Sequence, residues 1–343
     1  MQLSYFQSSL FKVVLLVGSI GFGIVQGFGI SQVVAQGKDA AYPNRQITLI
    51  IPFPPAGATD ALGRMLSQKL TQRLGQTIIV DNHPGAGGSI GSNLVARAAP
   101  DGYTLLLSTG STHAVAPSFT KKLPYDTQAD FTPIGGVAIA PGLLTITKTL
   151  PVKNLKEFIE YARAHPNEIN YATSGNGTVM HLNAESLKAT ARFNMTHIPY
   201  KGSALATPDL ISGKVHLLFD TTIASLPLVT DGKLMALGVA SPKRSPLLPN
   251  VPTIAEAGKD YGLGQFETSN WFGLYGPKNL SAEIVNKLNA ALNTVLLEKD
   301  TRERLALLGA EPIPGSPEKF ATMVALDRVR WTKIIQQNQI SID

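Results

Sequence analysis

The chain has 343 residues, which exceeds one ordinary domain and suits two of about 100 to 200 residues each. Hydrophobic residues make up 44% and charged residues 16%, a composition that indicates a globular protein and excludes extended disorder. The net charge is +6, but the basic residues are scattered, and nucleic-acid binding requires a continuous basic stripe. We therefore expect no nucleic-acid partner. The chain has no cysteine, which excludes disulfides, thiolate metal sites and a cysteine nucleophile.

The N-terminal segment is typical of an export signal. Lys12 is the only charge before Lys38, and the stretch 13–30 is mostly apolar. Val33 and Ala35 suit a signal-peptidase site, so we expect residues 1–35 to be a cleaved signal peptide. The alternative is an uncleaved membrane anchor, although the glycines within the apolar stretch make it a poor membrane span. Either interpretation predicts that the rest of the chain is exported.

From residue 47 onwards the pattern is a strand, a loop with glycine or proline, and then a helix. The apolar run 47–51 is typical of a strand buried on both faces of a sheet. Leucines at helical spacing predict a helix after it, with Gly75 as its C-cap. Further strands are predicted over 77–80 and 103–107. This alternation predicts an α/β fold with a mostly parallel sheet, whose ligands bind beyond the carboxyl ends of the strands.

A second set of elements begins near Pro151. Asn154 and Glu157 have the spacing of a capping box, and Pro166 ends the predicted helix. Four strands are predicted over 169–173, 195–200, 215–219 and 234–239. The C-terminal part is predicted to hold two helices. One has an apolar face from Ile284 to Leu296, and the other has Ser316 as N-cap and Pro317 at its first position.

Nucleotide and metal sites do not fit the sequence. The glycine-rich loop 85–91 has Ile90 at the position of the third glycine of a dinucleotide motif, so a tight turn is the simpler interpretation. His113 and His181 are isolated and lack the paired spacing of a metal site. Each histidine is open to a structural, ligand-binding or catalytic role. We expect no enzymatic activity, no cofactor and no metal.

Four predicted strand-to-helix loops are rich in Gly, Ser, Thr and Asn: 54–60, 108–113, 174–181 and 201–204. Such loops present backbone N–H groups, hydroxyls and helix N-termini, which are hydrogen-bond donors that suit a carboxylate. Lys201, in the last loop, is the only basic side chain of the four loops. We therefore expect an anion to be held by dipoles and neutral donors.

A series of motifs runs in order from about residue 42 to the C-terminus. The two longest are IPFPPAGATD at 51–60 and DNHPGAGG at 81–88. Shorter ones are APDGY at 99–103, KLPYD at 122–126, GNGT at 175–178, PYKG at 199–202, FD at 219–220 and SNWFG at 269–273. With these motifs the chain resembles the Bug-type receptors, the extracytoplasmic solute-binding components of tripartite tricarboxylate transporters.

The resemblance implies a periplasmic binding protein fold with two α/β domains around a ligand cleft. Domain one would comprise 42–140 plus 241–343, and domain two 141–240, so that the chain crosses between them twice. It also implies a monomeric periplasmic receptor that closes around a small carboxylate, such as a dicarboxylate or an acidic amino acid, and delivers it to membrane permease subunits. The alternatives are a sensory binding protein that signals to a membrane partner without transport, and an exported enzyme that uses the same cleft.

The resemblance also implies a set of ligand-binding residues. One carboxylate would lie between the loops 54–60 and 174–178, and Asp220 would face the ligand. The predicted set is Phe53, Pro54, Ala56, Gly57, Ala58, Thr59, Asp60, Thr109, Ser111, His113, Ser174, Gly175, Gly177, Thr178, His181, Tyr200 and Asp220. Most family members have Gly-Gly where this chain has Ala56-Gly57. We expect Ala56 to cost free energy if its position requires a positive φ.

Overall fold

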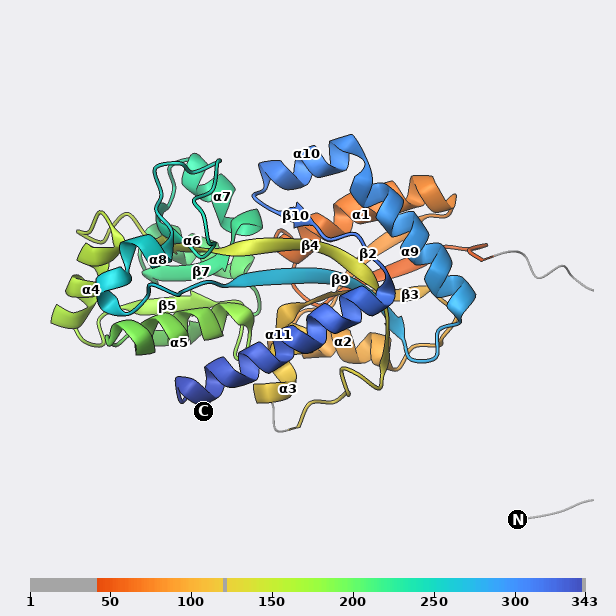
Figure 1. Ribbon diagram of the computed structural model, residues 1–343, viewed down its shortest axis with the longest axis horizontal. Helices are drawn as coiled ribbons and strands as arrows, with labels where there is room; N and C mark the ends of the chain where they lie inside the picture. The colour runs from red at the N-terminus through yellow and green to blue at the C-terminus, as the bar shows by residue number, and fades with distance from the viewer. Residues whose placement is uncertain (1–41, 120–121, 341–343) are drawn as a thin grey trace, which may run out of the picture. The chain divides into compact units, whose positions relative to one another are not determined.

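The computed structural model describes residues 42–119 and 122–340 (Figure 1). The predicted signal peptide, residues 1–35, lies outside the described residues. Among the helices of the described ranges, none is both long and apolar enough to cross a bilayer. The strands form a ten-stranded sheet in the order β2-β1-β3-β9-β4-β7-β5-β6, and β8 and β10 also pair with β4.

The first section of the sheet is parallel. It consists of β1 (Ile47–Ile51), β2 (Ile78–Asn82) and β3 (Thr104–Thr109), with β1 between the other two. Between them lie α1 (Ala58–Leu74), η1 (Ala86–Gly88) and α2 (Ser89–Ala96). Gly75 has a φ of 70° and donates its N–H to the Thr71 carbonyl, which confirms the predicted C-cap.

The second parallel section consists of β5 (Asn170–Thr173), β6 (Thr196–Pro199) and β7 (Leu217–Thr221). Its helices are α4 (Leu155–Ala164), α5 (Val179–Ala191), α6 (Ser203–Ser212) and α7 (Thr222–Thr230). They are followed by β8 (Met235–Val239), α8 (Ile254–Ala257) and η3 (Lys259–Tyr261). The side chain of Asn154 accepts from the Glu157 N–H at the start of α4, as the predicted cap requires.

Two long antiparallel strands join the two sections. β4 (Phe131–Ile146) pairs with β9 (Ser269–Pro277) along its first part and with β7 and β8 along its second part. Figure 1 shows both strands running between the group of α4 to α7 and the group of α1, α2 and α9. The α/β fold is confirmed, and the sheet is mixed, with parallel sections at its two ends and antiparallel pairs in the centre.

The C-terminal helices cover the first section. They are α9 (Ala282–Leu297), α10 (Lys299–Leu307) and α11 (Pro317–Gln337), with the short strand β10 (Glu311–Pro312) before α11. The Ser316 hydroxyl accepts from the Lys319 N–H, and Pro317 opens the helix, as predicted. The π-helical turn η2 (Ser111–Val115) and α3 (Ala116–Phe119) follow β3.

Separate hydrophobic clusters lie in the two sections. The first joins β1, β3 and β9 to α1 and α9, and the second joins β4, β5 and β7 to α4 and α5. We keep the two-domain division as a proposal. Ile254, Leu263 and Phe266 belong to the second cluster. We therefore place the return crossing at β9 instead of residue 241.

Candidate ligand-binding site

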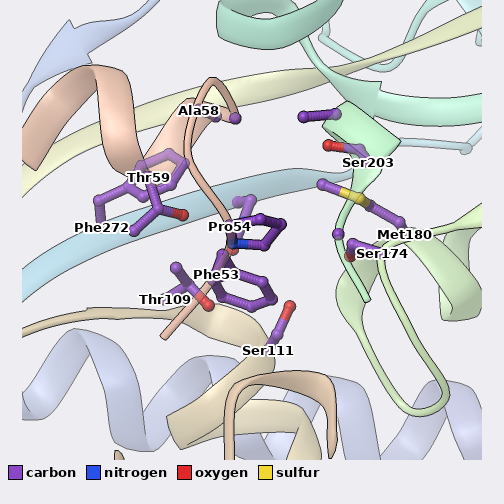
Figure 2. A pocket seen from close by; sticks show the side chains of 14 residues that line it. Phe53, Pro54, Ala58, Thr59, Thr109, Ser111, Ser174, Met180, Ser203 and Phe272 are labelled. Atoms are coloured by element: carbon purple, nitrogen blue, oxygen red, sulfur yellow. The ribbon is translucent and has the colours of Figure 1, made fainter. Parts of the chain in front are cut away.

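A pocket lies where the loops after β1, β3 and β5 meet the start of α6 and the strand β9. In Figure 2, Phe53, Pro54, Ala58 and Thr59 stand on one side, and Ser174, Met180 and Ser203 stand on the other. The two sides therefore come from the first and the second parallel section. This is the edge at which α/β sheets bind their ligands.

Eight of the predicted residues line this pocket: Phe53, Pro54, Gly57, Ala58, Thr59, Thr109, Ser111 and Ser174. Nine do not line it: Ala56, Asp60, His113, Gly175, Gly177, Thr178, His181, Tyr200 and Asp220. Six lining residues were not in the predicted set: Met180, Gly202, Ser203, Ala204, Asn270 and Phe272. The first four of these lie in or beside loops that the sequence singled out, whereas the last two belong to β9, a strand that the periodicity did not reveal.

Two helix N-termini meet at the pocket without side-chain caps. α1 begins after Gly57 and α6 begins after Gly202, and neither N-cap residue makes a side-chain hydrogen bond. By contrast, the N-cap Thr178 of α5 accepts from the His181 N–H. The first N–H groups of a helix have no partner within the helix, and the helix dipole makes this end positive. α1 and α6 thus present two anion-binding ends to one pocket.

Two hydroxyls in the pocket wall also lack partners. Thr109 Oγ1 and Ser174 Oγ are buried and make no hydrogen bond with any described residue. A third hydroxyl, Ser111 Oγ, accepts the Val179 N–H at 3.0 Å and so links η2 to the start of α5. Buried polar atoms without partners are costly and usually mark a place where another molecule binds. Because no lining residue is charged, the pocket offers a carboxylate only neutral donors.

Asp60 does not line the pocket but holds the loop 53–60 in place through hydrogen bonds. Its Oδ2 accepts from the Ala56 N–H at 3.1 Å and from Arg64 Nε at 2.9 Å, and its Oδ1 accepts from Asn82 Nδ2 at 3.0 Å. Burial alone would raise the pKa of Asp60, but these hydrogen bonds lower it overall. Asp60 is therefore an ionised loop-ordering residue. Ala56 is exposed with a φ of 68°, the conformation in which alanine costs free energy.

The loop 174–181 is held by its own side chains. Thr178 Oγ1 donates to the Gly175 carbonyl at 2.8 Å, and His181 Nδ1 accepts from the Gly177 N–H at 3.2 Å. Burial lowers the pKa of His181 to about 4, so its ring is neutral at physiological pH. Tyr200 donates its hydroxyl to Asp209. These predicted residues shape the loops around the pocket and do not line it, because their polar atoms are used within the protein.

Asp220 lies at the end of β7 and is 2% exposed. Its Oδ1 accepts from the Thr221 N–H at 2.6 Å, whereas Oδ2 has no partner among the described residues. Burial raises the pKa of Asp220 to about 6, although hydrogen bonding from Ser203 and Thr221 lowers it. Because Ser203 lines the pocket, the Asp220 carboxyl lies one side chain behind the wall.

His113 lies away from this pocket, against the rings of Phe131 and Tyr275.

Comparison with known proteins agrees with this architecture. Residues 62–340 match the family described as tripartite tricarboxylate transporter family receptor. The chain is 37% identical to protein BugT of Bordetella pertussis over 299 residues, which cover 86% of this chain and 90% of BugT.

Solved structures are similar over most of the chain. R. palustris Rpa4515, solved with adipate, is 38% identical with a TM-score of 0.84, and the match covers 88% of this chain and 99% of that one. MatC from Rhodopseudomonas palustris, solved with bound malate, is 34% identical with a TM-score of 0.81, covering 86% of this chain and 100% of that one. The periplasmic binding protein BugD is 35% identical with a TM-score of 0.83, covering 88% and 99%. The resemblance found in the motifs is confirmed, and the chain belongs to the receptor family of the tripartite tricarboxylate transporters.

Proposed function

We propose that this protein is a periplasmic receptor that binds a small carboxylate, such as a dicarboxylate or an acidic amino acid, in the pocket between the two sections. The observation that carries the proposal is the meeting of two uncapped helix N-termini and two unpartnered hydroxyls in one uncharged pocket. Adipate and malate in the solved relatives Rpa4515 and MatC support the ligand class. Delivery of the ligand to membrane permease subunits is part of the proposal and follows from the family.

The arrangement favours a ligand with two anionic groups. One carboxylate would accept from the first N–H groups of α1 and from Thr109, which belong to the first section. The other would accept from the first N–H groups of α6 and from Ser174, which belong to the second. Only the closed form lets one ligand touch both N-termini, so the free energy of these contacts would drive hinge closure.

Asp220 would tune the choice of ligand. Its ionised carboxyl lies behind Ser203, on the side of α6, and would disfavour a second carboxylate placed very close to it. An amine or hydroxyl on the ligand would instead be a donor for the unpartnered Oδ2. An amino or hydroxy dicarboxylate therefore combines the features that this pocket favours.

Two other functions would use the same pocket. A sensory receptor that signals without transport would bind its ligand identically, so only the membrane partner separates it from a transport receptor. An exported enzyme would need an activated nucleophile. Residues 87–91 match the Gly-x-Ser-x-Gly pattern of hydrolases. However, Ser89 makes no hydrogen bond with a histidine within the described ranges, and the nearby Tyr125 hydroxyl donates to the Thr112 carbonyl, which favours binding over catalysis.

A thermal-shift screen tests the proposal. The purified mature protein is heated with a panel of mono-, di- and tricarboxylates and with acidic and neutral amino acids. A ligand at about 100 times its Kd adds about 2.7 kcal/mol of stability, which raises the melting temperature of a protein of this size by a few degrees. We expect dicarboxylates to give the largest shifts. A response only to neutral sugars or amines would contradict the proposal.

A further inference from the structure

A second cavity lies between η2, the segment 127–133 and α11. It has a volume of about 170 Å³ and shares no lining residue with the first pocket. Its lining residues are His113, Thr127, Gln128, Phe131, Pro133, Tyr275, Ala321, Val324, Ala325 and Arg328. This volume is close to the roughly 150 Å³ of an apolar cavity that binds benzene. The turn η2 connects the two pockets, because Ser111 lines the first and His113 lines the second.

His113 brings an unused hydrogen-bonding atom to this cavity. The side chain is 1% exposed, and its Nδ1 lies 2.7 Å from Ser108 Oγ. Nδ1 also lies 3.1 Å from Thr112 Oγ1, so hydroxyls that can donate or accept occupy this side of the ring. Nε2 has no partner among the described residues. A buried ring nitrogen without a hydrogen-bond partner is costly unless a ligand supplies one.

Arg328 supplies the charge. It lies on α11, and its guanidinium makes no hydrogen bond or ion pair within 4 Å with the described residues. Backbone hydrogen bonds from Ala129 and Gln128 chiefly lower the pKa of Asp126, and the charge of Arg328 adds to this effect, but no acidic side chain lines the cavity itself. The cavity thus combines an arginine with a buried ring nitrogen that has no partner among the described residues, and no carboxylate is among its lining residues. This combination suits an anionic oxygen, and arginine binds carboxylates with paired hydrogen bonds.

The remaining walls are apolar and aromatic. The rings of Phe131 and Tyr275 lie 4.6 Å and 4.5 Å from the His113 ring, and Val324 and Ala325 of α11 complete the wall. Aromatic side chains of this kind favour contact with another ring in stacked or edge-to-face geometry.

The wall formed by residues 126–130 is firmly held. Asp126 Oδ1 accepts from the Gln128 and Ala129 N–H groups at 2.8 Å and 3.0 Å, and Lys278 bonds to Asp130. These contacts keep the segment that carries Thr127 and Gln128 in one conformation. The cavity is therefore a built feature of the fold and not a gap beneath a loose loop.

We propose that this cavity is a second ligand site, which takes a small aromatic carboxylate. The ring lies among Phe131, Tyr275 and Val324, and the carboxylate accepts from Arg328 and from His113 Nε2. The site is separate from the dicarboxylate pocket and is independent of the function proposed above.

The test uses 4-fluorobenzoate, whose binding is followed by fluorine NMR on the full mature protein. Ala325→Phe fills the second cavity, and Leu326→Phe is its matched control, because Leu326 is the next residue of α11 and is 67% exposed. Ala204→Phe fills the first pocket instead. We expect binding to wild type, Leu326→Phe and Ala204→Phe, and a loss of at least about tenfold in affinity for Ala325→Phe.

A second pair of variants tests the charge without filling the cavity. Arg328→Gln should weaken 4-fluorobenzoate by about tenfold, the scale of a lost charge-assisted hydrogen bond. Arg330→Gln should leave the affinity unchanged, because Arg330 lies outside the cavity and bonds to the Glu267 carbonyl. Circular dichroism confirms the fold of each variant. The proposal is overturned if wild type does not bind 4-fluorobenzoate, or if Ala204→Phe abolishes binding while Ala325→Phe and Arg328→Gln retain it.

Discussion

Replacing Ala56 with glycine should stabilise the protein. The φ of Ala56 is 68°, in the left-handed region that costs a residue with a Cβ about 1 to 2 kcal/mol. Glycine avoids that cost but loses about 0.5 to 1 kcal/mol of backbone entropy on folding. The side chain is exposed, so no packing is lost, and the N–H that donates to Asp60 is kept. The net gain should be about 0.5 to 1 kcal/mol, or about 2 °C in melting temperature.

The matched control is Ala61→Gly, five residues further along the chain, at an exposed position in the first turn of α1. Here the backbone is helical, so the same change should destabilise the protein by about 1 kcal/mol. Urea unfolding of the three proteins, followed by circular dichroism, measures both changes at one pH. If Ala56→Gly lowers the unfolding midpoint as Ala61→Gly does, then residue 56 does not carry the backbone strain that we assign to it.

Three further predictions concern acid stability, the pocket wall and closure. Acidification from about pH 7.5 to about pH 5 should destabilise the protein. Burial holds His113 neutral, with a pKa of about 3, whereas the unfolded residue takes up a proton below about pH 6.5. Stability is thus complete above this pH and falls below it, by about 2 kcal/mol at pH 5 for this residue. Denaturant titrations that show equal stability at both pH values would refute this. Asp220→Asn should raise stability above about pH 6, because it removes a buried charge, and should change the preference among amino, hydroxy and plain carboxylates. Unchanged affinities for all three in calorimetry would make Asp220 purely structural. Gly202→Ala should weaken ligand binding at least about tenfold, because its Cβ would lie 2.3 Å from Pro54 Cγ on the opposite wall of the pocket. Gly264→Ala, whose nearest neighbour would be at 3.8 Å, is the control and should bind normally.

Much of the fold could be predicted from local sequence. The run 47–51 is apolar because β1 is buried on both faces, and Gly75, Asn154 and Ser316 mark helix ends through the backbone groups that they satisfy. The strands β4 and β9 could not be predicted in this way. β4 contains Pro133, Gly135, Gly136, Pro141 and Gly142, residues that usually interrupt a strand. It tolerates them through two register shifts and through close packing, such as that of Gly136 against Ile313.

The candidate site, too, could be predicted only in part from the sequence. The loops were predictable because glycine, serine and threonine after a strand indicate backbone donors, and Thr59, Thr109 and Ser174 do line the pocket. The direction in which each side chain points was not predictable. Asp60 and His181 belong to the expected loops, yet their polar atoms form hydrogen bonds within the protein and do not face the pocket. Such internal hydrogen bonds depend on the folded loop and leave no pattern in the sequence.

Titration calorimetry of the mature protein with the best dicarboxylate tests the central claim most directly. The experiment compares wild type with Thr109→Val, which keeps the shape of the side chain and removes the unpartnered hydroxyl of the pocket. Thr301→Val is the control, because Thr301 Oγ1 is also buried without a partner among the described residues but lies on α10, outside the pocket. We predict that wild type and Thr301→Val bind alike, and that Thr109→Val binds about tenfold more weakly without loss of stability. Equal affinities of all three proteins for the dicarboxylate would contradict the account.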